Sequence, residues 1–117
     1  MNFDDAIHAH SAWKTKLSAY LRKPDQSLRS GDVRPDNLCE LGRWIHSAPS
    51  TVAATPEFKQ LREQHARFHR AAAAIIDMAN SGKPTTEATA LGSGSEFSEA
   101  SRNVVTMIMS LKRKVPA

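Results

Sequence analysis

Residues 55–80 read TPEFKQLREQHARFHRAAAAIIDMAN and carry a helical pattern from one end to the other. Thr55 is a typical helix cap, Pro56 suits the first helical position, and Glu57 complements the positive end of a helix dipole. Gly82 then supplies a stop signal just beyond the stretch. The residues of one face recur with a helical period: Phe58, Leu61, His65, Phe68, Ala72, Ile75 and Ala79. The stretch therefore predicts one long amphipathic helix with this face toward a core.

A second helical pattern precedes this stretch and extends from Phe3 to about Leu21. Its apolar residues follow the same period of about 3.6 residues, and His10 occupies one position of the apolar stripe. Residues 22–36, which follow, carry two prolines and a glycine among polar residues. This composition is typical of a loop, so we expect the chain to turn here before its next helix.

A short helix is predicted after this loop. Asn37, with Glu40 three residues later, resembles a helix start. The pattern continues through Trp44 and Ile45 and ends before Pro49. This short element separates the two long helices in the sequence.

The last helical pattern is less regular than the others and extends from about Thr85 to Lys114. Its second half is well patterned, but the glycine and serine residues in 91–95 are poor helix formers. They predict either a break in this helix or a seam where the helix packs closely against a neighbouring one. Together the patterns predict an all-α fold, a four-helix bundle with an additional short helix that carries Cys39.

The composition suits a single domain. The chain of 117 residues is long enough for one core, so we expect one domain over 1–117 with a core from about 3 to 111. The net charge of +4 is spread over scattered residues, which does not favour nucleic-acid binding. No run approaches the roughly 20 apolar residues that span a bilayer, and the N-terminus lacks a signal-peptide pattern. We therefore expect a cytoplasmic protein that binds neither membranes nor nucleic acid.

Histidine and cysteine, the residue types that most often bind zinc, occur at three places in the sequence. His65 and His69 are four apart, so both rings project from one face of the long helix and can bind one ion. Taken alone, this pair also fits two ordinary helix histidines. His10 lies on an apolar stripe, where a metal would satisfy one of its two ring nitrogens, although taken alone it is more typical of a core histidine bonded to a carbonyl.

The single cysteine completes this set. Cys39 falls in the first turn of the predicted short helix, where the helix dipole stabilises a thiolate. Three imidazoles and one thiolate form a closed tetrahedral shell for zinc. We therefore predict one Zn²⁺ site, with these ligands: His10, Cys39, His65 and His69.

Other uses of the histidines are less favoured. His8 points away from the helix face of His10, and His46 is left to contact solvent, a partner chain or the edge of the site. A zinc-protease motif needs glutamate where this chain has Ala66. A closed shell leaves no open position for catalysis. The predicted inward faces also lack the bridging carboxylates of a di-iron carrier, so we expect neither catalytic residues nor enzyme activity.

Three segments carry a family resemblance: AIHAHSAWK at 6–14, CELGRW at 39–44 and HARFH at 65–69. They resemble the chemoreceptor zinc-binding (CZB) domain family, and the Cys-x-Leu-Gly-[Lys/Arg]-Trp box is the most specific of them. The resemblance extends from about residue 3 to residue 111. It implies that the four residues named above are the zinc ligands, and that Trp13 and Trp44 pack around the site.

The resemblance also implies a function. Such domains are bacterial sensory modules of the four-helix-bundle type, often homodimeric, whose zinc occupancy alters chemotaxis or cyclic-di-GMP signalling. Oxidation of the zinc-bound Cys39 by hypochlorous acid or another oxidant is a further implied stimulus. The chain has no room for an output domain, so we expect a signalling partner or a longer receptor of the chemoreceptor or diguanylate cyclase type. A constitutive structural zinc module stays open as an alternative, as do a metal-dependent enzyme and a di-iron carrier.

Overall fold

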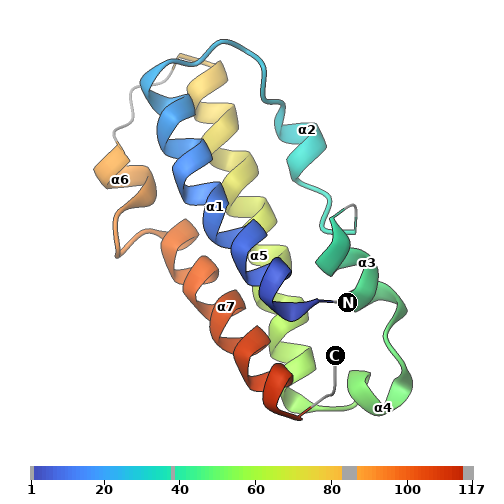
Figure 1. Cartoon of the computed structure of the whole chain (residues 1–117). Helices are drawn as coiled ribbons and strands as arrows, with labels where there is room; N and C mark the ends of the chain where they lie inside the picture. The colour runs from blue at the N-terminus through green and yellow to red at the C-terminus, as the bar shows by residue number, and fades with distance from the viewer. Residues whose placement is uncertain (1, 38, 83–86, 115–117) are drawn as a thin grey trace.

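Three long helices pack side by side in this computed structural model, which describes residues 2–37, 39–82 and 87–114 (Figure 1). These helices are α1 (Phe3–Arg22), α5 (Pro56–Asn80) and α7 (Glu96–Lys114). Helix α5 contacts both α1 and α7, and α1 also contacts α7, so the three enclose a shared core. Within the described residues the secondary structure is all helical, which confirms the all-α prediction.

Shorter helices connect and cover the long ones. They are α2 (Ser30–Val33), α3 (Glu40–Ser47), α4 (Ser50–Ala53) and α6 (Glu87–Leu91). Helices α2, α3 and α4 lie in the part of the chain that links α1 to α5, and all three contact α5. Neither α2 nor α4 was expected, because one-turn helices leave no readable period in a sequence. The expected count of four bundle helices is not confirmed.

The long helix α5 begins where its sequence predicts. The Thr55 side chain accepts a hydrogen bond from the Phe58 amide at 3.2 Å, and Pro56 is the first helical residue. Most residues of the predicted face, including Phe68, are buried in the core. The helix ends at Asn80, two residues before Gly82. Gly82 has a φ of 72°, a left-handed conformation that glycine adopts at little cost.

The last predicted helix is broken into α6 and α7, one of the two outcomes that its glycine-serine run allowed. The Ser95 hydroxyl accepts a hydrogen bond from the Ser98 amide at 3.2 Å, which caps the new helix start. The buried Ser98 hydroxyl donates to the Leu91 carbonyl at 2.7 Å and so ties the two helices together. The predicted start at Thr85 lies outside the described residues.

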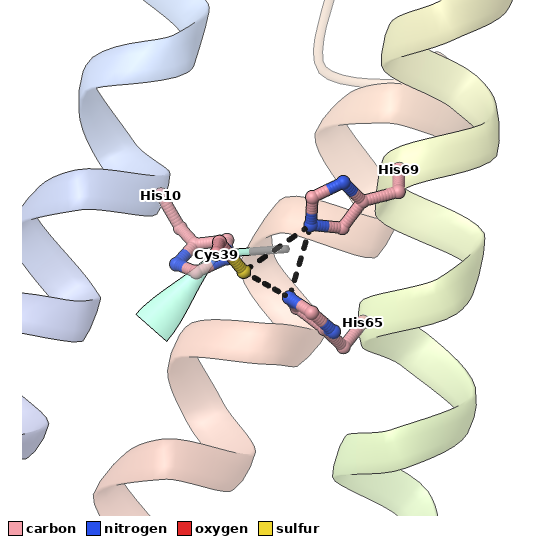
Figure 2. Close-up of side chains that lie close together, drawn as sticks. All are labelled: His10, Cys39, His65 and His69. Atoms are coloured by element: carbon pink, nitrogen blue, oxygen red, sulfur yellow. Dashed lines mark hydrogen bonds between the residues drawn. The ribbon is translucent and has the colours of Figure 1, made fainter. Parts of the chain in front are cut away.

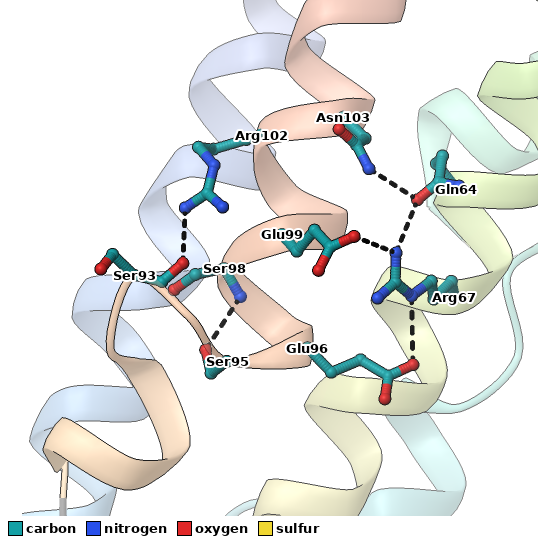
Figure 3. A network of polar contacts seen from close by, with 9 residues as sticks. All are labelled: Gln64, Arg67, Ser93, Ser95, Glu96, Ser98, Glu99, Arg102 and Asn103. Atoms are coloured by element: carbon teal, nitrogen blue, oxygen red, sulfur yellow. Dashed lines mark hydrogen bonds and ion pairs between the residues drawn. The ribbon is translucent and has the colours of Figure 1, made fainter.

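A polar network joins α5 to α7 along the outside of the bundle (Figure 3). Arg67 pairs with Glu96 at 3.1 Å and with Glu99 at 3.4 Å. Gln64 accepts hydrogen bonds from Arg67 and from Asn103. These contacts keep α7 in a defined register against the helix that carries the histidine pair. Within the described ranges, none of the helices has both the length and the apolar character that crossing a bilayer requires.

Candidate metal centre

Four side chains from three segments meet between α1, α3 and α5 (Figure 2). His10 approaches from α1, His65 and His69 from α5, and Cys39 immediately precedes α3. One ligand atom from each residue can be chosen so that all four atoms lie within 4.8 Å of one another. The tertiary structure therefore brings together all four residues that the sequence analysis selected.

Two of the histidines are oriented by backbone carbonyls. His10 Nδ1 lies 2.8 Å from the carbonyl oxygen of Ala6, one turn earlier in α1. His69 Nδ1 lies 2.7 Å from the carbonyl oxygen of Val33, in α2. When Nδ1–H donates to a carbonyl, Nε2 keeps its lone pair and can bind a metal. Both rings are therefore held in the tautomer and orientation of a zinc ligand.

The third histidine completes a cluster that fits a cation. His65 Nε2 lies 3.0 Å from His69 Nε2 and 3.3 Å from Cys39 Sγ, and His69 Nε2 lies 3.7 Å from the same sulfur. In a tetrahedral zinc site, ligand atoms are separated by about 3.3–3.6 Å, as bond lengths of about 2.1 and 2.3 Å require. The three observed separations, 3.0–3.7 Å, lie within about 0.4 Å of those edges, and the His10 ligand atom lies within 4.8 Å of the other three. His65 Nδ1 is buried and has no hydrogen-bond partner among the described residues.

Burial keeps the imidazoles in the form that binds metal. Removal from water lowers the pKa of His10 and of His69, and it lowers the pKa of His65 to about 2, with smaller contributions from the neighbouring histidines. The three rings are therefore neutral at physiological pH. A neutral imidazole offers its lone pair to a cation without first losing a proton.

Cys39 differs from the histidines in its exposure and its position. It is partly exposed, and it is the N-cap residue of α3, with Sγ 3.3 Å from the Gly42 amide that donates to it. Burial raises the pKa of the thiol, and the Gly42 amide opposes this effect. Zinc binding must therefore displace a proton from the sulfur. The sequence placed the helix start at Asn37, which was wrong because the cysteine sulfur itself caps the helix.

The structure explains two residues of the CELGRW box that bind no metal. A Cβ at Gly42 would collide with the carbonyl group of Asp36, so only glycine allows the loop before α3 to lie this close. The Trp44 ring contacts the rings of Phe3 and Phe58, with centroid separations of 5.3 Å and 5.7 Å. Trp44 therefore fastens α3 to both α1 and α5.

The remaining candidates stand apart from the metal-ligand cluster. His8 is exposed, and His46 is exposed with Nε2 3.3 Å from Asp36 Oδ1. Trp13 is partly buried against the core, and its ring lies under the Lys16 ammonium at 4.4 Å. That Trp13 and Trp44 pack around the metal itself stays a prediction. The carbonyls of Ala6 and Val33 were missed, because a main-chain acceptor leaves no signal in a sequence.

Comparison with known proteins agrees with this chemistry. A family model described as the chemoreceptor zinc-binding domain matches residues 10–76, more than half of the chain and a range that includes all four ligands. No curated protein sequence and no solved structure matched the chain. The cluster contains imidazoles and a thiol but no carboxylate, so it fits zinc and does not fit a carboxylate-bridged di-iron centre. The chain belongs to the chemoreceptor zinc-binding domain family, and its cofactor is Zn²⁺.

Proposed function

We propose that this domain is a cytoplasmic sensory module in which the state of Cys39 controls the position of α3. The observation that supports this proposal is the difference between the ligands: the three histidines are buried in long helices, whereas Cys39 is partly exposed and precedes a helix of eight residues. Cys39 is therefore the ligand residue that is partly open to solvent, and α3 is the element that loss of this ligand would free.

Oxidation of the sulfur is the proposed signal. The Cys39 thiolate attacks the chlorine of hypochlorous acid and expels hydroxide, and hydrolysis of the resulting S–Cl bond then gives the sulfenic acid and chloride. The sulfur is thereby oxidised by two electrons, which leave on the chloride. A thiolate is a strong zinc ligand, and its oxidised forms are poor ones. The same change weakens the sulfur as acceptor for the Gly42 amide. Both effects loosen the start of α3.

The movement would pass to a partner through the surface of the bundle. Helix α3 packs on the core through Leu41 and Ile45, and Trp44 links it to the other helices. A shift at Cys39 therefore changes contacts on both α1 and α5. We propose a homodimer that conveys this change to a chemotaxis or cyclic-di-GMP signalling protein, either in trans or as part of one receptor.

The test compares zinc release by oxidant in matched variants. Stoichiometric hypochlorous acid is added to zinc-loaded protein, while a zinc-sensitive dye and tryptophan fluorescence are recorded. Exposed Met109 is a second target for this oxidant, so Met109→Leu serves as the control. We expect the control to release zinc like the wild type. Cys39→Ser, folded and loaded with zinc at high concentration, should lose the rapid release. An equal response from Cys39→Ser would contradict redox sensing.

A constitutive structural role is the second candidate. It is favoured by the three buried histidines, because a zinc ion there would join α1 to α5 whatever the state of the sulfur. In that case oxidant would leave tryptophan fluorescence and the oligomeric state unchanged, although a chelator would lower stability. Enzyme activity is not part of the proposal, because four protein ligands leave zinc no open position.

A further inference from the structure

A small cleft lies between α1 and α7, on the side of the bundle where the glycine-serine run separates α6 from α7. Its volume is about 190 Å³, below the range of about 300–1,000 Å³ that drug-sized ligands occupy. It is lined by Lys14, Ser93, Phe97, Ser98, Ser101 and Arg102. The lining is therefore one aromatic floor surrounded by two cations and three hydroxyl groups, which is a suitable size and chemistry for a small ion.

The two cations have no carboxylate partners among the residues that the structure describes. Lys14 is exposed on α1, and Arg102 is exposed on α7. Arg102 Nη1 donates to the carbonyl oxygen of Ser93 at 2.9 Å, which fixes the guanidinium beside the cleft (Figure 3). Its other N–H groups have no acceptor among the described residues. The nearby acids of α7, Glu96 and Glu99, pair with Arg67 instead. The positive charge at the cleft is therefore uncompensated.

The hydroxyl groups add neutral donors to this charge. Ser98 Oγ is already committed to the Leu91 carbonyl and is buried. The hydroxyls of Ser93 and Ser101 make no hydrogen bond within the described part of the chain. A hydroxyl can rotate its proton toward any acceptor that arrives. The cleft thus offers a planar guanidinium, a flexible ammonium and two free O–H donors, from two helices and the loop before α7.

We propose that this cleft binds a phosphate group. Arginine recognises the oxygens of phosphate through paired N–H donors, lysine adds a point charge, and serine hydroxyls reach the remaining oxygens. A tetrahedral oxyanion accepts from several directions at once, as this arrangement of donors requires. The proposal is independent of zinc and oxidant sensing, because no metal ligand lines the cleft. The phosphate is that of the free ion or of a small monoester.

The test is a titration of ¹⁵N-labelled, zinc-loaded protein with inorganic phosphate, followed by amide chemical shifts at about 150 mM salt, where distant charges are screened. We expect saturable shifts concentrated in residues 93–102. Lys14→Gln/Arg102→Gln should weaken binding about tenfold or more, because each lost cation removes a charge-assisted hydrogen bond. Lys59→Gln/Arg62→Gln is the matched control: it removes the same charge from exposed positions of α5 outside the cleft, and should bind like the wild type.

Two results would overturn the proposal. The first is a set of chemical shifts that do not saturate. The second is an equal loss of phosphate affinity in the control variant, which would show that phosphate responds only to the net charge of the protein. Zinc content and far-ultraviolet circular dichroism establish that each variant is folded. If the double variant is not folded, Lys14→Gln alone is used, because that exposed side chain makes no hydrogen bond to described residues. A parallel titration with glycerol phosphate separates the two sources. If glycerol phosphate binds more tightly than inorganic phosphate, the cleft is assigned to a monoester. If glycerol phosphate binds more weakly, the cleft is assigned to the free ion.

Discussion

Gly42 and Asp36 lie against each other so closely that a side chain on residue 42 would collide with the Asp36 carbonyl group. The same glycine donates its amide hydrogen to Cys39 Sγ at 3.3 Å. One residue thus sets both the path of the loop before α3 and the position of the metal-binding sulfur. The zinc site depends on this contact, although neither residue binds the metal.

We therefore expect Gly42→Ala to damage the site without removing a ligand. The added methyl group must displace the loop or the start of α3, which costs about 1–3 kcal/mol of unfolding free energy and lowers zinc affinity. Urea unfolding and a competition assay with a zinc chelator measure the two effects. Gly31→Ala is the control, because a Cβ there meets no other atom within 4 Å. If both variants bind zinc equally well, the contact does not position Cys39.

Zinc should stabilise the wild type and not a variant that lacks a buried ligand. Free zinc at about 100 times its dissociation constant adds about 2.7 kcal/mol to the unfolding free energy. We expect His10→Ala to lose this gain and to be purified with clearly less than one zinc per chain. His8→Ala, an exposed histidine on the same helix, should keep both. Metal analysis and thermal unfolding with and without zinc measure these outcomes, and zinc loss in His8→Ala would contradict the ligand assignment.

The zinc-free protein should lose stability as the pH falls. Burial lowers the pKa of His65 to about 2, against about 6.5 in the unfolded chain. Between these values the unfolded chain binds a proton that the folded chain refuses, so the unfolding free energy decreases below about pH 6.5. His65 alone contributes a slope of about 1.4 kcal/mol per pH unit. His10 and His69, whose pKa values are also lowered, make the slope steeper.

Urea unfolding of the chelator-treated protein at about pH 7.5, 6.5 and 5.5 measures this slope. His65→Gln removes one of the three titrating groups and should flatten the curve. A stability that stays constant over this pH range would contradict the neutral, buried state of the histidines.

Trp44 should matter for zinc binding through α3. Removing its ring deletes the contacts with Phe3 and Phe58, and we expect Trp44→Ala to cost about 3 kcal/mol and to weaken zinc binding, because α3 then holds Cys39 less firmly. Trp44→Phe keeps part of the contact and should restore part of the affinity. Chelator competition and urea unfolding provide the measurements. Undiminished zinc affinity in a folded Trp44→Ala protein would show that α3 is positioned by other contacts.

The local features of this protein could be predicted from its sequence. The extents of α1 and α5 and the Thr55 cap follow from periodicity and capping side chains, which act within a few residues of each other, whereas the glycine-serine run before α7 allowed a break as one of two outcomes. The four ligands could also be selected, because together they make a complete tetrahedral shell for zinc, although none of them is a specific signal alone. The true cap of α3 was missed, since a cysteine sulfur is an uncommon helix cap.

The way in which these helices and side chains meet could not be predicted from the sequence. The approach of Val33 to His69 and the placement of Lys14 and Arg102 along one cleft each join segments far apart in the chain. No local propensity encodes such contacts, because they result from the packing of whole helices against a shared core. The four ligands are recognisable in the sequence, but their convergence on one point is a property of the packed helices.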